Sequence, residues 1–200
     1  MSDPQPAQAV KLIVSLFSGE SRLLGDAIRA LSEKYGNIDF ISASVPFDYT
    51  DYYTKEFGAS LVRRLITIDR LIRPESLPDV KLWTNTLEAR LSTDGRRTVN
   101  IDPGYIARAH LILVTGKGYS HRPYLRDGIY ADLTLLYRNH AFESLPWTYP
   151  DYAGEEMIGF MTRIRDKYGL QLRGKTGEAS AAAGGAEVSG ENRLNEEMIR

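Results

Sequence analysis

The sequence predicts a single α+β domain in which helices pack against a mostly antiparallel or mixed sheet. Three observations lead to this prediction. Two apolar runs flank a segment of helical periodicity at the start of the chain, which is the pattern of a β-α-β unit. After residue 97 the apolar period changes to two, which is typical of antiparallel strands. With 42% hydrophobic residues in a chain of 200, one sizeable core can form.

The β-α-β opening is predicted from residues 11–47. KLIVSLF (11–17) is a continuous apolar run, as in a strand that is buried on both faces. Ser18 is in position to cap the helix that follows, and Gly36 is in position to end it. IDFISASVPF (38–47) is predicted to be the second strand. Apolar side chains recur at helical spacing between the two strands, at Leu24, Ile28, Leu31 and Tyr35.

The middle of the chain is predicted to hold one strand and a second helix. DYTDYYTKEFG (48–58) indicates a loop with a short helical turn, and RRLITIDRLI (63–72) indicates a strand. Pro78 suits the first turn of a helix, which ends before a turn at Asp94-Gly95. The apolar positions of this helix are Val80, Trp83, Leu87 and Leu91.

The second half is predicted to be mainly antiparallel strand. The strand candidates are RTVNID (97–102), HLILVTG (110–116) and GIYADLTLLYR (128–138). Pro103-Gly104 is predicted to turn the chain after the first of these. Asn139-His140 is predicted to turn it after the third, into the short strand AFESL (141–145).

The two ends of the chain are predicted to lie outside the domain. Residues 1–9 are polar and contain proline, which predicts a flexible arm. A last helix is predicted at 154–168 and ends at Gly169. The segment 171–200 has too little apolar surface to offset its ordering entropy, so we expect a disordered tail. The folded domain is therefore predicted to span 10–170.

The composition argues against several classes of function. The formal net charge of −1 creates no long-range field that would draw the protein onto nucleic acid or anionic lipid. The absence of cysteine excludes disulfides, thiolate metal sites and a thiol nucleophile. No signal peptide and no apolar stretch of membrane-spanning length is present, so we expect a soluble, cytoplasmic protein.

Known cofactor and metal motifs are missing as well. No phosphate-binding glycine loop and no G-x-S-x-G motif is present, so the sequence indicates no particular cofactor. The three histidines do not show the paired spacing of metal ligands, and no metal site is predicted. They are His110, His121 and His140.

The densest chemistry lies in GKGYSHRPYLRDGIYADLTLLYR (116–138). Lys117, His121, Arg122 and Arg126 precede the predicted strand, with no acidic residue before Asp127. Guanidinium and ammonium groups bind phosphate or carboxylate, and imidazole moves protons near neutral pH. A solvated basic loop explains the same residues equally well.

The strand inside this segment has two faces. Alternation places Ile129, Ala131, Leu133, Leu135 and Tyr137 on the core face. The other face carries Tyr130, Asp132, Thr134, Leu136 and Arg138. This second face is either exposed to solvent or the floor of a pocket.

Two other segments carry polar side chains of interest. In VNIDPGYI (99–106), Asn100 and Asp102 share one face, and a structural role for Asp102 in the turn is the favoured interpretation. An aspartate at a strand end beside Tyr105 also suits a general base or a metal ligand. Tyrosines gather in 48–58 and in LPWTYPDY (145–152), which indicates a polar cavity wall or a partner surface.

Six motifs occur in one order, and together they resemble a known family. They are PFDYTDYY, KLWTNTLE, VNIDPGYI, KGYSHRPYL, GIYADLTLLYR and LPWTYPDY. The chain resembles domain-of-unknown-function family 4416, a set of bacterial and archaeal proteins, over residues 10–168. It departs from the family pattern at Pro123, where a β-branched residue is usual, and at Asp132, where glutamate is usual. Some members carry a GTP-binding label, so the resemblance implies at most a guanine nucleotide.

The leading hypothesis is a protein that binds, or acts as an enzyme on, an anionic or phosphorylated small molecule such as a nucleotide. Lys117, Arg122 and Arg126 would contact the anion, with His121, Asp102 and Asp132 as the catalytic candidates. Tyrosines would line the wall of the site, at Tyr105, Tyr124 and Tyr130. The alternatives are an RNA- or protein-binding module and a tyrosine-rich homo-oligomeric scaffold.

Overall fold

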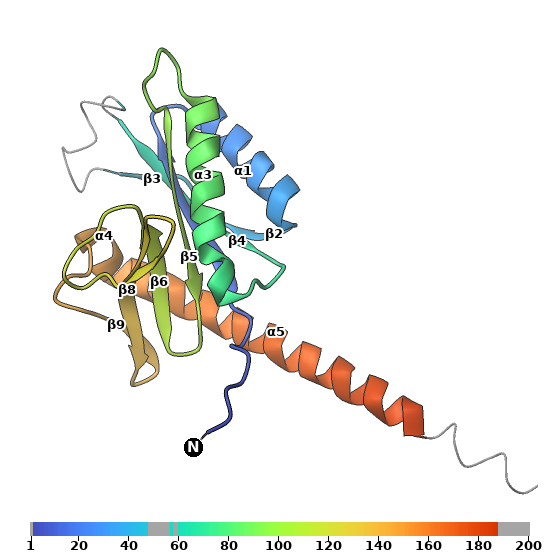
Figure 1. Cartoon of the computed structure of the whole chain (residues 1–200). Coiled ribbons are helices and arrows are strands. Elements are labelled where there is room, and N and C mark those ends of the chain that lie inside the picture. Colours follow the sequence, from blue (N-terminus) through green and yellow to red (C-terminus); the bar gives the residue numbers. More distant parts are fainter. Residues whose placement is uncertain (1, 48–56, 58–59, 188–200) are drawn as a thin grey trace, which may run out of the picture. The chain divides into compact units, whose positions relative to one another are not determined.

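The computed structural model describes residues 2–47, 57 and 60–187 of the chain. Within these residues nine strands form one sheet in the order β2-β4-β1-β5-β6-β8-β7, with β3 beside β4 and β9 beside β8. The strands are β1 (Lys11–Ser18), β2 (Ile38–Ile41), β3 (Val45–Pro46), β4 (Val62–Ile68), β5 (Val99–Ile106), β6 (His110–Thr115), β7 (Tyr124–Arg126), β8 (Ile129–Arg138) and β9 (Ala141–Ser144). The helices are α1 (Ser21–Tyr35), η2 (Pro74–Ser76), α3 (Leu77–Leu91), α4 (Pro150–Ala153) and α5 (Glu155–Glu187). The predicted α+β class is confirmed (Figure 1).

The predicted β-α-β opening forms with a strand inserted into it. β1 and β2 each pair antiparallel with β4, which lies between them, so β1 and β2 run parallel without touching. Gly36 ends α1 as predicted, with φ of 114°. Ser18 does not cap α1, because its hydroxyl donates to the carbonyl of Thr98 at 2.6 Å and accepts from the Glu20 amide at 3.0 Å.

The single strand predicted at 38–47 is interrupted. β2 stops at Ile41, and the short β3 resumes the pairing with β4 at Val45. Ser42 accepts a hydrogen bond from the Leu65 amide through its hydroxyl, which replaces a strand hydrogen bond at the break. The prediction for 48–58 lies outside the described residues except at Phe57.

The predicted turn at Pro103-Gly104 is wrong, because β5 runs straight through both residues. The sheet tolerates this proline because β6 pairs with β5 only from Gly104 onward. The amide and carbonyl of Ile101 bond to side chains of α3, so they face the edge of β5 that has no strand partner. Backbone groups two residues apart in a strand face the same edge, so the nitrogen of Pro103, which has no hydrogen, faces this open edge as well. A side chain at Gly104 would place its Cβ 2.4 Å from the Ile112 carbonyl oxygen, so only glycine allows the strands to approach.

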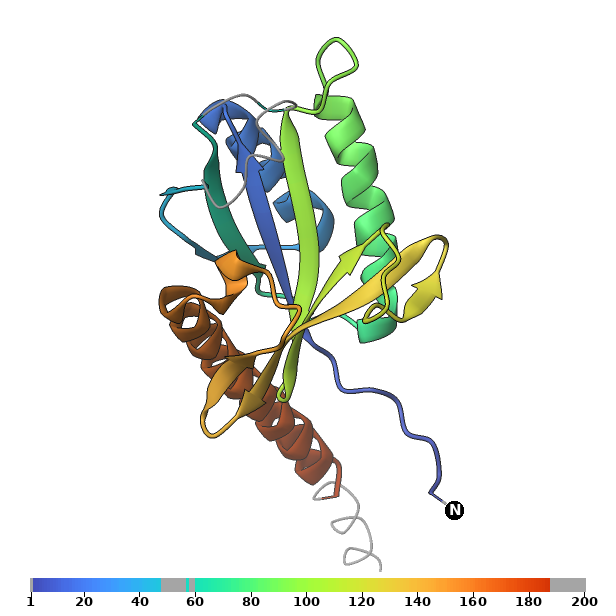
Figure 2. The same cartoon turned by 90° about the vertical axis from the view of Figure 1, so that its left-hand side faces the viewer.

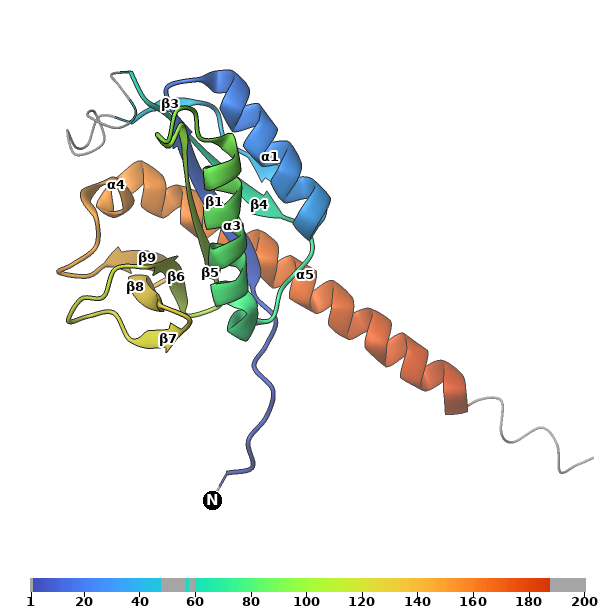
Figure 3. The same ribbon diagram turned by 45° about the horizontal axis from the view of Figure 1, so that its top comes forward.

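The two faces of the sheet are covered by different helices. α1 and α3 lie on one face, over an apolar cluster that includes Leu12, Val14 and Leu16 of β1 (Figure 3). The start of α5 packs on the other face, where Met161 and Ile164 join a second apolar cluster. α4 precedes α5 on this second face and contributes Tyr152 to the same cluster.

The last helix extends beyond its predicted end. α5 continues through Gly169 to Glu187, so the prediction that Gly169 ends the helix is wrong. The chain divides into two compact units, Met1–Arg165 and Asp166–Arg200, and α5 contributes residues to both. The predicted division into an arm (1–9), a domain (10–170) and a disordered tail (171–200) stays a prediction.

Candidate functional site

The buried charges of strands β1, β4 and β8 lie on the sheet face that bears α4. Asp132 of β8 pairs with Leu113 of β6, and Leu113 pairs with Gly104 of β5. Asp102 is two residues from Gly104 and lies opposite Ser15 of β1, so register places all three polar side chains on one face. This face forms the candidate site.

Asp132 is buried although the alternation of its strand allowed it to be exposed. A register shift between β6 and β8 makes Thr134 an extra residue on β8, so that Leu135 faces the same core as Leu113. Asp132 and Thr134 are both buried, so of the two alternatives for this face the solvent-exposed one does not hold for them. The carboxylate of Asp132 accepts a hydrogen bond from Nε of Arg122 at 2.8 Å.

Around Asp132 lies a group of side chains that we call the Asp132 cluster. It consists of His121, Arg122, Asp132, Trp147 and Tyr149. The His121 ring stacks on Trp147, with ring centroids 5.2 Å apart and planes inclined by 16°. Tyr119 contacts the same imidazole edge-on at 5.2 Å.

His121 is the one side chain of this cluster with an unsatisfied polar atom. Its Nε2 is buried without a hydrogen-bond partner among the described residues, and Oδ2 of Asp132 lies 3.6 Å away. That separation is too long for a hydrogen bond. A buried polar atom without a partner costs about 1–3 kcal/mol, so its presence calls for a physical reason.

Arg122 is held by protein groups on every side. Besides Asp132, it donates to the Lys117 carbonyl at 3.1 Å and to the Tyr149 hydroxyl. These contacts make Arg122 a brace between the 116–123 loop, β8 and the segment before α4. They leave the Arg122 side chain largely buried and occupied rather than open to a ligand.

A second polar group, the Arg63 cluster, lies on the same face. It consists of Ser15, Arg63, Asp151 and Tyr152. Arg63 donates to the Ser15 hydroxyl at 2.9 Å and to Asp151 at 2.7 Å, and its guanidinium lies 4.8 Å from the centre of the Tyr152 ring. Burial raises the pKa of the Tyr152 phenol, so this group stays neutral beside Arg63.

A third group, the Lys81 cluster, fills the open edge of β5. It consists of Lys81, Glu88, Arg97, Asn100 and Asp102. Glu88 accepts from the Ile101 amide at 2.6 Å, and Lys81 donates to the Ile101 carbonyl at 2.8 Å. Side chains from α3 thus supply the hydrogen bonds that a neighbouring strand would make, where β5 stands apart from β6 and β8 (Figure 2).

Electrostatic interactions link the Lys81 cluster to the Arg63 cluster. Burial raises the pKa of Glu88, although Lys81 opposes this shift by stabilising the charged carboxylate. Asp102 bonds to Lys81 at 3.2 Å and to Asn100 at 2.6 Å, and it also adds to the raised pKa of Tyr152. The Lys81 and Arg63 clusters therefore border each other across β1 and β5.

The structure brings together part of the predicted site. Lys117, His121, Arg122 and Asp132 meet in or beside the Asp132 cluster. Asp102 shares their sheet face but belongs to the Lys81 cluster, and its predicted role in a turn is lost with that turn.

Of the other predicted site residues, Tyr130 lies against Gly118 of the 116–123 loop, whereas Arg126, Tyr124 and Tyr105 lie outside the Asp132 cluster. Arg126 pairs with Asp79 and Asp127 at the β7 edge, both at 2.6 Å. Tyr124 and Tyr130 contact each other edge-on at 5.3 Å. Tyr105 packs against the apolar cluster under α1 and α3, on the opposite face from Asp132, and burial raises its pKa. Whether any of these residues acts on a ligand stays a prediction.

Sequence reasoning did not select Ser15, Arg63, Lys81 or Glu88 as site residues. Arg63 was part of a predicted strand, and its partner Asp151 is 88 residues away. Charged residues inside apolar runs, as in VRRLITI, are the signal that could have found Arg63. Lys81 and Glu88 lie on a helix whose other positions predicted only an apolar stripe.

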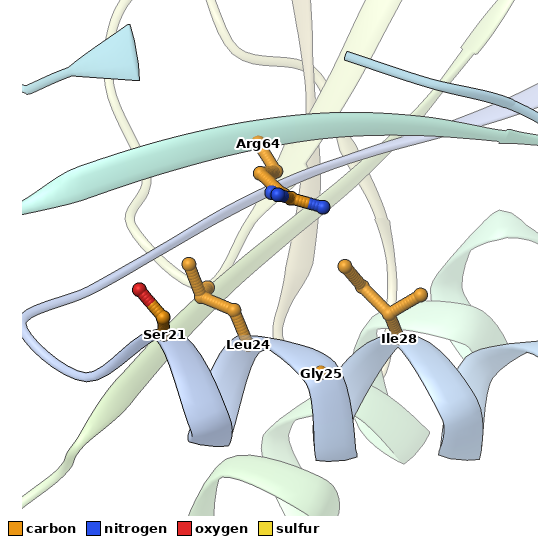
Figure 4. A pocket seen from close by; sticks show the side chains of 5 residues that line it. All are labelled: Ser21, Leu24, Gly25, Ile28 and Arg64. Atoms are coloured by element: carbon orange, nitrogen blue, oxygen red, sulfur yellow. The ribbon is translucent and has the colours of Figure 1, made fainter. Parts of the chain in front are cut away.

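A hollow between α1 and β4 lies on the other side of the sheet. Ser21, Leu24, Gly25, Ile28 and Arg64 line it (Figure 4). Its volume of about 100 Å³ is well below that of ordinary small-molecule pockets. Arg64 is bonded to Ser44 at 2.8 Å, so this hollow offers no comparable chemistry.

Groups of metal ligands and membrane-spanning helices are absent from the residues that the structure describes. In the described part of the chain, no three histidine, aspartate or glutamate side chains are grouped to hold a metal ion. No helix within the same residues has the length and apolar character to cross a membrane.

Fold and site together define an α+β protein that buries an array of paired charges on one face of an antiparallel sheet. The chain belongs to the family described as Domain of unknown function (DUF4416), whose model matches residues 8–168. The resemblance drawn from the six motifs is thereby confirmed. No curated protein and no solved structure matches the chain.

Proposed function

We propose that this protein binds a small molecule with an anionic group and a planar ring, such as a nucleotide, at the Asp132 cluster. The observation that carries the proposal is the buried, unpartnered Nε2 of His121 beside Asp132. The other cationic group of the cluster, Arg122, is occupied by protein acceptors, which leaves this imidazole as the group that can change its bonding.

His121 supplies the contact for the anion. An imidazolium donates from both ring nitrogens, so His121 in this form would direct Nε2 at Asp132 and Nδ1 at a ligand. Distances of this kind are commonly long in unliganded sites and shorten on binding. A histidine that is oriented by a carboxylate, as His121 is by Asp132, can also accept or donate a proton during a reaction. Proton transfer is therefore the class of reaction that these two residues support if the ligand reacts.

Exposed aromatic rings around His121 support the planar part of the ligand. Three exposed large aromatic side chains belong to or contact the Asp132 cluster: Tyr119 (69%), Trp147 (39%) and Tyr149 (46%). Trp147 is fixed by a hydrogen bond from Nε1 to the Leu133 carbonyl at 2.9 Å, and Tyr149 is fixed by Arg122. Rings that are exposed yet held in place are suited to stacking on a planar group.

A thermal-shift screen of the purified protein tests the proposal. The panel consists of inorganic phosphate, phenyl phosphate, cyclohexyl phosphate and nucleotides. A ligand at 100 times its Kd adds about 2.7 kcal/mol of stability. For a chain of this size the melting temperature should rise by roughly 5–10 °C.

Two histidine variants form the matched comparison. His121→Asn should abolish the shift, whereas His140→Asn, in an exposed turn with φ of 64°, should leave it unchanged. A shift that survives in His121→Asn would place the ligand elsewhere. No shift across the panel would overturn the proposal and favour the alternatives of an RNA or protein partner or a homo-oligomer.

A further inference from the structure

The Asp132 cluster and the Arg63 cluster are joined by one short segment, residues 145–152, which we call the strap. Its first half is attached to β8: Trp147 donates to the Leu133 carbonyl at 2.9 Å, and Thr148 donates to the Thr134 carbonyl at 2.6 Å. In this half Trp147 stacks on His121, and Tyr149, which follows Thr148, accepts a hydrogen bond from Arg122. The strap therefore supplies one wall of the candidate site.

The second half of the strap is attached to β4 and β1 by the Arg63–Asp151 ion pair. The Arg63 side chain is 3% exposed and the Asp151 side chain 13% exposed. Two nitrogens of Arg63 point in different directions, Nε to Ser15 and the terminal nitrogen to Asp151. Because a guanidinium is a rigid fork, this double contact fixes both the position and the orientation of the strap.

Stability alone does not require charges at this place. The Arg63 guanidinium lies over the rings of Phe47 and Tyr152, at 5.4 and 4.8 Å from their centres, so an apolar pair would also find packing partners here. Replacement of a buried ion pair by apolar side chains of similar volume is often neutral or stabilising. A buried ion pair in such surroundings is instead suited to selecting one arrangement of the chain.

We propose that Arg63 and Asp151 are positioning residues for the His121 site. Their ion pair fixes the strap, and the strap holds the Trp147 ring against His121 and the Tyr149 hydroxyl against Arg122. The inference rests on the proposed function only in treating His121 as the ligand contact. The effect of the Arg63–Asp151 ion pair on the stacking of Trp147 against His121 is measured without a ligand.

The test reads the stack between His121 and Trp147 by fluorescence. The chain contains two tryptophans, so Trp83→Phe leaves Trp147 as the only one. A stacked imidazole quenches indole emission, and His121→Gln in this background should therefore raise the emission. The difference in Trp147 emission between the chains with and without His121 measures how well the two rings stack.

The decisive variant is the double substitution Arg63→Met with Asp151→Leu. It should keep or raise the melting temperature, yet abolish the emission difference and the binding of phenyl phosphate. Asp151→Glu, which restores the charge on a longer side chain, should recover part of the difference. A double variant that retains the full emission difference would overturn the proposal.

A second ion pair on the same sheet face provides the matched control. Lys11 and Asp39 are joined at 2.5 Å with side chains 0% and 12% exposed. Lys11→Met with Asp39→Leu should leave the emission difference unchanged. If this control abolished the difference as well, the effect would be general loosening, and positioning by Arg63 and Asp151 would be refuted.

The two proposals fail in different ways. If the parent chain binds no compound of the panel, the proposed function fails, and the fluorescence comparison still decides the coupling. If the parent chain binds phenyl phosphate and the double variant binds it equally well with an unchanged stack, the positioning role fails while the proposed function stands.

Discussion

The two faces of the central strands β1 and β4 achieve burial by opposite means. On the face under α1 and α3, the side chains that β1 and β4 bury are apolar except for Ser18 at the end of β1: Leu12, Val14, Leu16, Ile66 and Ile68. On the other face the same two strands bury Lys11, Ser15, Arg63 and Thr67 beside Ile13 and Leu65. One face is held by packing, and the other is held by packing plus pairing of each charge.

This difference predicts two kinds of sensitivity. An apolar contact has no direction, so a substitution on the α1 and α3 face should lose stability in proportion to the volume removed. A buried charge needs a partner at one position, so a substitution on the α4 face should act mainly by leaving that partner unpaired. Substitutions on the α4 face should therefore change the local geometry, and with it ligand binding, more than substitutions on the α1 and α3 face.

The sharpest comparison uses adjacent residues of β1. Leu16→Ala should lower the free energy of unfolding by about 3–5 kcal/mol, because Leu16 is fully buried among apolar neighbours. Ser15→Ala should cost only about 1 kcal/mol, since Arg63 keeps its bond to Asp151. Urea denaturation measures both, and equal losses would contradict the difference between the faces.

The second comparison concerns two aspartates of the 116–138 segment. Asp132→Asn should lower the free energy of unfolding by about 1.5–3 kcal/mol, because Arg122 loses its buried charged acceptor. It should also weaken phenyl phosphate at least about tenfold, since each 1.4 kcal/mol of lost contact changes affinity by that factor. Asp127→Asn removes an exposed contact to Arg126 and should leave melting temperature and affinity unchanged. Calorimetric titration of both variants decides whether burial of the charge matters.

The smallest expected effect is a pH dependence from Glu88. Burial raises its pKa in the folded state above the ordinary value of 4.5, so the folded protein binds this proton more tightly than the unfolded chain. The resulting stabilisation is present below pH 4.5 and is lost as the pH rises through the raised pKa. Glu88→Gln has no carboxyl group to ionise and does not lose this stabilisation. The free energy of unfolding of Glu88→Gln minus that of the parent should therefore increase between pH 4.5 and the raised pKa of Glu88, and stay constant above it.

Urea denaturation between pH 4 and pH 8 follows this trend. Glu33→Gln, an exposed position on α1, provides the baseline for removal of a carboxylate. If the free energy of unfolding of Glu88→Gln minus that of the parent fell with rising pH, then Lys81 and the Ile101 amide would lower the pKa of Glu88 by more than burial raises it.

Much of the framework was predictable because it depends on local patterns. The continuous run of β1, the helical spacing before Gly36, and the proline at the start of α3 each identify an element without any knowledge of its neighbours. The turn at Asn139-His140 also formed as predicted, with φ of 47° and 64°. In contrast, Pro103-Gly104 has the composition of a turn, and only the open edge beside β5 and the close approach of β6 make it part of a strand.

The candidate site shows the same division between local and long-range information. His121, Arg122 and Asp132 could be predicted to meet because they are separated by at most 11 residues along the chain. The Arg63–Asp151 pair could not, because 88 residues separate its members and no local pattern marks either as a partner. Asp132 itself was left between solvent and pocket, since the bulge at Thr134 that accompanies its burial appears only in the register of β8 against β6.

By itself, then, the sequence determined the fold class, the family, most of the elements and one group of neighbouring polar residues, because periodicity and turn chemistry operate over a few residues. Tertiary structure alone decided the insertion of β4 between β1 and β2, the continuation of β5 through its proline, and the pairing of buried charges across the α4 face. Those features depend on contacts between distant segments, and a buried charge is tolerated only where folding places a partner beside it.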